Sequence, residues 1–397
     1  MFSRQGAKVA KECTALGLNL DPRISFASFA SFARDAFDSG SIMETTKLKI
    51  PAEWRRAAEE ILSHGGPVMV IGAPGSGKTT FCQYLTANFC RQGKKVAWID
   101  GDPGQPFVGP PAVLSLSVYT AAEELLTRKG AMSTTFIGNT SPVGHLLEMI
   151  AGLQKLAVRA AAYEPDLLIV NTCGLVHGGA ARELGFHEID MSGPKYIVAL
   201  QKGSEVEHLL SPHSHRAGLL MLRMPVAPEA KLLTREARLA SREFRFKEYF
   251  RGAGFQEIEI ADVGIHGHGI GTGERLAFYD VNKLSKIVGG LVVHAELSAD
   301  RLFMMMEGEY SGDELFTAKE AYSVREVTVL KRSEMDHLLL GLNDDQNLCM
   351  GLGILREFDV RDQVLRVITP LRDLSAIRHV VFGSLRVSPA GTELGRM

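Results

Sequence analysis

Residues 72–79 read Gly-Ala-Pro-Gly-Ser-Gly-Lys-Thr and directly follow the apolar run Val68–Ile71. A Gly, four further residues and Gly-Lys-Thr, set between a strand and a helix, are typical of a phosphate-binding loop. Gly75 and Gly77 allow backbone N–H groups to turn toward phosphate oxygens, and the helix that follows adds its positive dipole end. The alternative is a glycine-rich turn without a ligand, and the flanking strand and helix argue against it.

The predicted nucleotide site consists of this loop and the residue after it. Lys78 is expected to reach the β- and γ-phosphates, and the hydroxyl of Thr79 is expected to bind Mg²⁺. The nucleotide is ATP or GTP, because the chain lacks an Asn-Lys-x-Asp guanine-reading element and this absence does not exclude GTP. The residues expected to contact the nucleotide are Gly72, Ala73, Pro74, Gly75, Ser76, Gly77, Lys78, Thr79 and Thr80.

Apolar strands alternate with helical stretches from Pro51 onward, which predicts a parallel sheet covered on both faces. The predicted fold class is therefore α/β, a P-loop doubly wound parallel sheet over residues 49–263. A smaller β-rich C-terminal domain is predicted over residues 264–397, because short strand-like runs follow the glycine-rich segment 264–273. The strands predicted for the parallel sheet are Val68–Ile71, Val96–Ile99, Leu167–Val170, Tyr196–Leu200 and Leu219–Met224.

Residues 1–48 are predicted to form a poorly ordered extension. They carry few acidic groups and repeat Ser, Phe and Ala over residues 25–32. A targeting peptide is the alternative, since such segments are rich in serine and poor in acids. We prefer a start at Met43, in which case residues 1–42 do not belong to the native protein.

Net charge, cysteine spacing and the length of apolar stretches limit which partners, metals and compartments the sequence predicts. The net charge of −2 gives no general attraction to nucleic acid, so a polyanion would need a local basic patch. The five cysteines include no Cys-x-x-Cys pair, which predicts a cytoplasmic protein without disulfides or structural zinc. No apolar stretch is long enough to span a bilayer, so no membrane association is expected.

Polar side chains follow two of the predicted strands, at the sheet edge where ligands bind in such folds. The segment Asp100–Gln105 reads Asp-Gly-Asp-Pro-Gly-Gln. One of its two carboxylates can hold the Mg²⁺ shell while the other accepts a proton from an attacking hydroxyl. The alternative is a turn with solvated carboxylates. Asn171 and Thr172 end another strand, where a ligand contact and a strand-terminating cap are equally good interpretations.

The segment 231–251 carries a stripe of arginines at spacings of three and four, which place them on one helical face. Such a stripe can close over a triphosphate or line a nucleic-acid backbone. A solvated helix face paired with Glu236 and Glu243 is the alternative. The four arginines are Arg235, Arg238, Arg242 and Arg245.

Taken together, these segments resemble the polynucleotide 5′-hydroxyl kinases of RNA processing. That family combines a phosphate-binding loop, an Asp-x-Asp-x-Gly-Gln Walker B segment, a Thr-x-Gly "clasp" and an Arg-x-x-x-Arg "lid". Here the last three are Asp100–Gln105, Thr172–Gly174 and Arg238–Arg242. Residues 138–142, 351–355 and 368–370 also look like the family, and the resemblance runs from about residue 50 to the end.

The resemblance implies an ATP- or GTP-dependent kinase, of prokaryotic type, that phosphorylates the 5′-hydroxyl ends of RNA or DNA. It implies that Thr79 and Asp102 hold Mg²⁺ and that Asp100 or Asp102 is the base, and we lean toward Asp100. Gln105 would place the acceptor, Thr172 would clasp the γ-phosphate region, and the lid arginines would cover the transferred group. The implied catalytic residues are Lys78, Asp100, Asp102, Gln105, Thr172, Arg238 and Arg242.

The chain departs from the family pattern in three places, none of which removes a catalytic group. Leu175 follows the clasp where eukaryotic members usually have Trp, and Pro74-Gly75 replace an acidic residue of the loop. The N-terminal β domain of eukaryotic members is missing, and the sequence identifies no protein partner. A small-metabolite kinase and a non-catalytic ATP-bound scaffold of an RNA-processing complex are the alternative functions.

Overall fold

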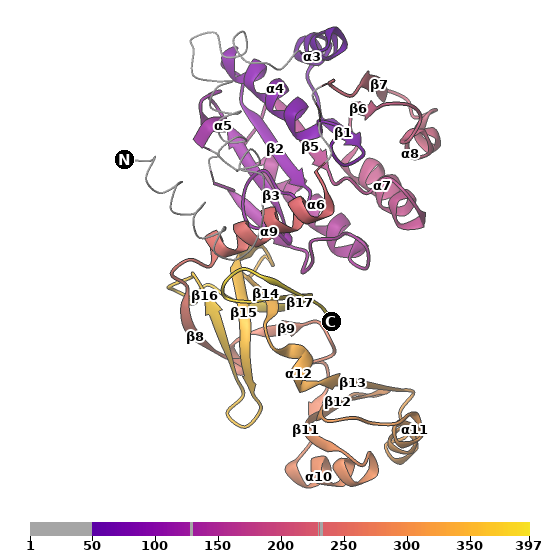
Figure 1. Cartoon of the computed structure of the whole chain (residues 1–397), viewed down its shortest axis with the longest axis vertical. Coiled ribbons are helices and arrows are strands. Elements are labelled where there is room, and N and C mark those ends of the chain that lie inside the picture. Colours follow the sequence, from indigo (N-terminus) through magenta and orange to yellow (C-terminus); the bar gives the residue numbers. More distant parts are fainter. Residues whose placement is uncertain (1–49, 128–129, 229, 231–232) are drawn as a thin grey trace.

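The computed structural model describes residues 50–127, 130–228, 230 and 233–397. The predicted extension 1–48, with the Met43 start, lies outside these residues. Three blocks follow one another along the long axis: an α/β domain, a β-sheet domain and a small α/β unit at the far end (Figure 1). Among the described residues, none of the helices is both long and apolar enough to cross a membrane.

The α/β domain is built on a seven-stranded sheet with the order β4-β3-β2-β5-β1-β6-β7. Strands β2, β5, β1, β6 and β7 are parallel, as predicted, whereas β3 and β4 add an antiparallel edge that was not predicted. The α/β fold class is therefore confirmed. The strands are β1 (Val68–Gly72), β2 (Val96–Gly101), β3 (Val113–Tyr119), β4 (Ser133–Phe136), β5 (Leu167–Thr172), β6 (Tyr196–Gln201) and β7 (Leu220–Pro225).

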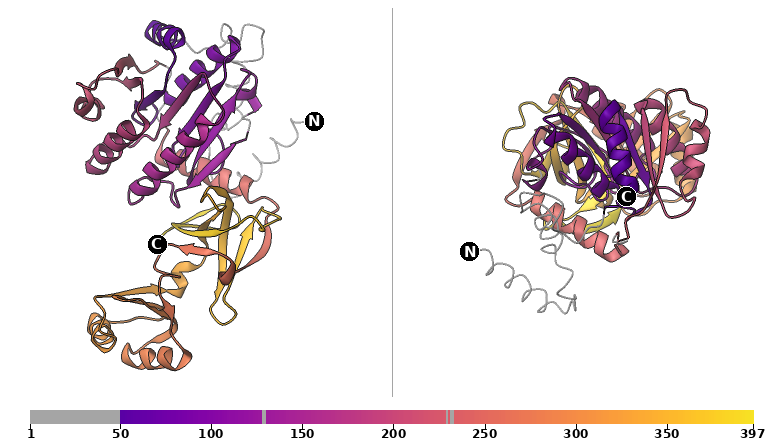
Figure 2. Two further views of the ribbon diagram at one scale, coloured as in Figure 1. Left: turned by 180° about the vertical axis from the view of Figure 1, so that it is seen from behind. Right: turned by 90° about the horizontal axis from the view of Figure 1, so that it is seen from above.

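Helices lie on both sides of this sheet (Figure 2), which explains why its central parallel strands β1, β2, β5 and β6 are mostly apolar. Val68 and Val70 of β1 enter one hydrophobic core with Trp54, while Met69 and Ile71 enter the opposite core. The helices are α3 (Ala52–His64), α4 (Lys78–Arg91), α5 (Glu124–Thr127), α6 (Leu146–Ala161), α7 (Gly179–Ser192), α8 (Glu207–Leu210), the 3₁₀ helix η1 (Ser211–His213) and α9 (Arg235–Tyr249).

The C-terminal sheet has the strand order β18-β17-β14-β15-β16-β8, and β9 pairs with β17. Strand β8 starts at Gly254, so this sheet begins before residue 264, where the domain boundary was predicted. Its elements are β8 (Gly254–Glu259), the 3₁₀ helix η2 (Ile260–Asp262), β9 (Gly264–His266), β14 (Leu338–Asn343), β15 (Cys349–Asp359), β16 (Val364–Thr369), β17 (His379–Val387) and β18 (Glu393–Arg396).

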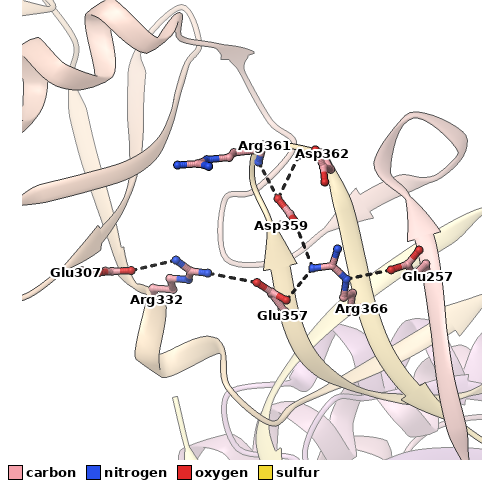
Figure 3. Close-up of polar contacts among 8 residues, drawn as sticks. All are labelled: Glu257, Glu307, Arg332, Glu357, Asp359, Arg361, Asp362 and Arg366. Carbon is pink, nitrogen blue, oxygen red and sulfur yellow. Dashed lines mark hydrogen bonds and ion pairs between the residues drawn. The ribbon is translucent and has the colours of Figure 1, made fainter.

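A small α/β unit is inserted between β9 and β14, within the region predicted to be β-rich. Its four strands have the order β10-β11-β12-β13. Ion pairs from Arg332 and Arg366 through Glu357 connect this unit to the C-terminal sheet (Figure 3). The elements are β10 (Glu274–Arg275), α10 (Phe278–Ile287), β11 (Leu291–Leu297), β12 (Arg301–Glu307), α11 (Gly312–Ala321), β13 (Glu326–Lys331) and α12 (Arg332–Met335).

The C-terminal sheet packs directly against the α/β domain, close to where parallel strands β2 and β5 end. The Gly138 carbonyl accepts hydrogen bonds from the backbone N–H groups of Ser384 and Leu385, at 3.0 and 3.1 Å. Asn139 Nδ2 donates to Ser384 Oγ at 2.7 Å. Phe136 shares a hydrophobic core with C-terminal residues and with Phe246 of α9. The 138–142 segment therefore joins the two domains.

Candidate active site

The phosphate-binding loop connects β1 to α4, as the sequence predicts. Gly77 has φ 92°, and a Cβ at this position would lie 3.3 Å from the ring of Trp54. A side chain would therefore be strained by the backbone and crowded by the indole. Trp54 is itself fixed, because its Nε1 donates to the Pro225 carbonyl at 3.0 Å. Helix α3 thus packs against the phosphate-binding loop through Trp54.

The loop residues occupy the positions expected of a phosphate cradle. Ala73, Pro74, Gly75 and Ser76 form the turn, and the Ser76 N–H donates to the Ala73 carbonyl at 3.2 Å. Helix α4 begins at Lys78, so Thr79 and Thr80 lie in its first turn. The free N–H groups of that turn are the donors that bind anions at a helix start.

Lys78 is folded back onto the phosphate-binding loop. Its Nζ donates to the carbonyls of Gly72 at 2.7 Å and Ala73 at 3.1 Å. Burial lowers the pKa of this ammonium, and the negative charge of Asp102 opposes that shift more than any other group. The buried Lys78 ammonium therefore donates only to the two neutral carbonyls among the described residues, and a triphosphate can replace them as its hydrogen-bond acceptor.

Asp100 is the second-last residue of β2, and both oxygens of its buried carboxylate accept hydrogen bonds. Its Oδ2 accepts from the Phe107 N–H, and its Oδ1 accepts from Asn171 Nδ2 at 3.0 Å. Burial raises the pKa of this carboxyl to about 7. Asn171 Nδ2 also lies 3.4 Å from Thr79 Oγ1, so one amide connects the carboxylate with the predicted metal ligand.

Asp102 stands in a different environment two residues later. It is half-buried, and its Oδ1 accepts the N–H groups of Gly104 and Gln105, each at 2.9 Å. This turn fixes the carboxylate and leaves Oδ2 outside both of those bonds. Gln105 Nε2 donates to the Arg238 carbonyl at 3.0 Å, which places the first turn of α9 against the acidic turn.

Thr172 is buried at the end of β5, and its hydroxyl donates to the Val70 carbonyl at 2.9 Å. The side chain therefore ties β5 to β1. Gly174, two residues later, reaches the loop, because a Cβ there would lie 2.8 Å from Pro74 Cγ. The clasp segment thus contacts the phosphate-binding loop through Gly174.

The two lid arginines are placed differently on α9. Arg238 is half-buried, and its guanidinium makes no hydrogen bond to another described residue. Arg242 pairs with Glu393 of β18. Sequence reasoning missed Glu393, which lies far away in the chain. It weighed a ligand contact and a strand-terminating cap for Asn171, but not the link that this amide makes between Asp100 and Thr79.

Glu188 of α7 is a buried acid that carried no sequence signal. It lines a small cavity beneath the clasp together with Thr172, Cys173 and Val176. Burial alone raises the pKa of its carboxyl to about 8. The clasp therefore rests on a carboxylic acid that stays protonated at neutral pH.

This burial gives a pH-dependent stability. Between the ordinary glutamate pKa and about 8, the folded protein keeps a proton on Glu188 that the unfolded chain releases, so stability falls as pH rises. Glu188→Gln stays neutral, and we expect it to be more stable than the wild type at pH 8.5, by up to roughly 4 kcal/mol, but not at pH 5. Denaturant unfolding at both pH values measures this.

The matched control is Glu183→Gln, an exposed acid on the same helix. It should leave the free energy of unfolding nearly unchanged at both pH values. An equal difference between Glu188→Gln and the wild type at pH 5 and pH 8.5 would contradict the proton held by Glu188.

The chain is similar to known proteins over most of its length. Residues 72–252 match the family model described as the mRNA cleavage and polyadenylation factor CLP1 P-loop. The polyribonucleotide 5′-hydroxyl-kinase of Pyrococcus abyssi is 30% identical over 351 residues, covering 87% of this chain and 95% of the relative. That of Methanocaldococcus jannaschii is 30% identical over 330 residues, covering 83% and 89%.

The solved structure of a wild-type Clp1p–Pcf11p complex shares the fold. Its TM-score is 0.54 at 13% identity, and the match covers 88% of this chain and 82% of the solved one. The likeness therefore extends over the α/β domain and the C-terminal region together.

Proposed function

Because the chain belongs to the polyribonucleotide 5′-hydroxyl-kinase family, we propose that it transfers the γ-phosphate of ATP to the 5′-hydroxyl end of RNA. The observation that carries this proposal is the half-buried carboxylate of Asp102, whose charge acts on Lys78. A phosphate-binding lysine and an accessible base in one site are what transfer to a hydroxyl requires.

Lys78 and the loop N–H groups hold the triphosphate. Lys78 exchanges the carbonyls of Gly72 and Ala73 for phosphate oxygens, so that its ammonium donates to anionic acceptors instead of neutral ones. Transfer of this kind depends mainly on positioning and on neutralising charge, and the loop contributes to both.

The residues around Thr79 fit Mg²⁺. Asn171 Nδ2 lies 3.4 Å from Thr79 Oγ1 and 3.0 Å from Asp100 Oδ1, and its Oδ1 is buried without a hydrogen-bond partner among the described residues. A nearby cation would also favour the charged form of Asp100, whose pKa burial raises to about 7. We infer that Thr79 binds the ion and that Asp100 and Asn171 organise its water shell. When bound, Mg²⁺ neutralises charge on the β- and γ-phosphates.

The geometry favours Asp102 over Asp100 as the base. Asp100 is buried with both oxygens bonded, whereas Asp102 Oδ2 lies outside the turn that holds Oδ1. Asp102 then takes the proton of the 5′-hydroxyl while that oxygen bonds to the γ-phosphorus. The bond from the γ-phosphorus to its bridging oxygen breaks, and ADP leaves. Gln105, which contacts α9, is suited to hold the acceptor beneath the lid.

The experiment is transfer of γ-labelled phosphate from ATP, with Mg²⁺, to short 5′-hydroxyl RNA. We expect labelled RNA, and no label on the same RNA already carrying a 5′-phosphate. Parallel reactions with GTP and with 5′-hydroxyl DNA rank the donors and acceptors, because the 2′-hydroxyl is the group that distinguishes RNA from DNA. ATP binding without label on any oligonucleotide would contradict the proposal and favour a scaffold or a small-metabolite kinase.

A further inference from the structure

A charged pair ties the lid helix to the C-terminal strand of the protein. Arg242 Nε contacts Glu393 Oε1 at 2.5 Å, and Arg242 Nη2 contacts Glu393 Oε2 at 3.1 Å. The two side chains are only 19% and 13% exposed. Two parallel hydrogen bonds between largely buried side chains fix the plane of a guanidinium far better than a single surface ion pair does.

The backbone around Glu393 is fixed on α9 as well. The Glu393 N–H donates to Glu243 Oε1 at 3.1 Å. Gly391 has φ +91°, and a Cβ there would lie 2.4 Å from the Lys247 nitrogen and 2.6 Å from the Glu243 carbonyl oxygen. No other residue fits this close approach without displacing the helix. The turn before β18 therefore carries Glu393 to one defined place beside Arg242.

The way the pair is made leaves part of the guanidinium available. Glu393 occupies the edge formed by Nε and Nη2, and Nη1 takes no part in either bond. An arginine has five N–H donors in a rigid fork, so one side chain can serve two anions on different edges. Arg242 lies one helical turn after Arg238, whose carbonyl contacts Gln105 of the acidic turn.

We propose that Glu393 is a positioning residue for phosphoryl transfer, which orients Arg242 so that its free edge faces the transferred phosphoryl group. This inference rests on the proposed function. Glu393 touches neither nucleotide nor acceptor. It acts by holding the arginine ready, so that less side-chain freedom is lost when charge develops on the phosphoryl group.

The test compares Glu393→Gln, Arg242→Ala and the double variant with the wild type. Glutamine keeps the shape of Glu393 and removes its charge. The control is Glu357→Gln, which breaks ion pairs of the C-terminal sheet away from α9 (Figure 3). Two quantities are measured: kcat and KM for transfer from ATP to 5′-hydroxyl RNA, and the Kd for ADP with and without aluminium fluoride, which mimics the transferred group.

We expect Glu393→Gln to lower kcat by about tenfold with the KM values nearly unchanged, since it affects an interaction made in the transition state. Binding of ADP alone should be unaltered, and binding of ADP with aluminium fluoride should weaken by about tenfold. The double variant should be no worse than Arg242→Ala, because both changes remove one function. Glu357→Gln should behave as the wild type.

Several results would overturn the inference. They are an unchanged or raised kcat in Glu393→Gln, additive losses in the double variant, or a loss of thermal stability alone. Should Glu393→Gln fail to fold, Arg242→Lys keeps the ion pair but offers no second edge, and it must show the same loss of kcat. Absence of wild-type transfer to RNA would instead contradict the proposed function. The affinities of the wild type and Glu393→Gln for ADP with aluminium fluoride would still test the positioning role of Glu393.

Discussion

Lys78→Ala is expected to abolish phosphate transfer, with kcat reduced by about a thousandfold or more. Lys78 is the buried cation of the phosphate-binding loop, and its Nζ is held by the carbonyls of Gly72 and Ala73. Without it, the charge that develops on the γ-phosphate has no ammonium partner, and the affinity for ATP falls as well. Transfer to 5′-hydroxyl RNA and ATP binding by calorimetry measure both effects.

Lys95→Ala is the matched control for this change. Lys95 Nζ also donates to a backbone carbonyl, that of Tyr163 at 2.8 Å, but it lies outside the loop. Both variants should lose a similar, small part of their stability, about 1 kcal/mol for a lost hydrogen bond. Only Lys78→Ala should lose activity. Turnover retained by Lys78→Ala would show that the loop lysine does not act on the transferred group.

The motifs of the site were predictable from the sequence because the residues of each motif lie close together in the chain. The phosphate-binding loop, Asp100–Gln105 and Thr172 each follow an apolar strand, and parallel strands bring their carboxyl ends to one sheet edge. The central parallel strands β1, β2, β5 and β6 were found because burial on both faces makes them mostly apolar, whereas β7 at the sheet edge is largely exposed.

What the sequence did not reveal depends on long-range contacts. Strand β3 contains the buried serines Ser115 and Ser117, which hide its apolar character. Strand β8 pairs with β16 across more than a hundred residues, so nothing local assigns it to the C-terminal sheet. Arg242 and Glu393 are 151 residues apart, and only the fold places the acid beside the lid.

The Thr172 side chain illustrates a subtler difference. The resemblance implied a hydroxyl that clasps the γ-phosphate region, whereas the structure bonds this hydroxyl to Val70 and brings Gly174 against Pro74. A sequence motif tells which residues occur together. It does not tell whether a side-chain atom or a backbone atom of the motif contacts the ligand. The clasp role of this segment stays a prediction, and we now expect it to act through backbone groups near Gly174.

Asp102→Asn is expected to lower kcat by about 10²–10⁴-fold, the usual contribution of a general base, with ATP affinity nearly unchanged. Asparagine keeps an oxygen that can accept the Gly104 and Gln105 N–H groups, so the turn should persist. What is lost is the carboxylate oxygen that takes the proton. Single-turnover transfer to 5′-hydroxyl RNA at saturating ATP isolates this step from binding.

Asp100→Asn separates the two carboxylates, because its expected defect is of another kind. Both Asp100 oxygens accept hydrogen bonds, from Phe107 N–H and Asn171 Nδ2, so an amide NH₂ would face one of these donors. We expect a loss of stability of about 1–3 kcal/mol and a weaker response to Mg²⁺ that higher Mg²⁺ partly restores. Near-normal turnover in Asp102→Asn, together with a loss in Asp100→Asn that Mg²⁺ does not restore, would reverse the assignment and make Asp100 the base.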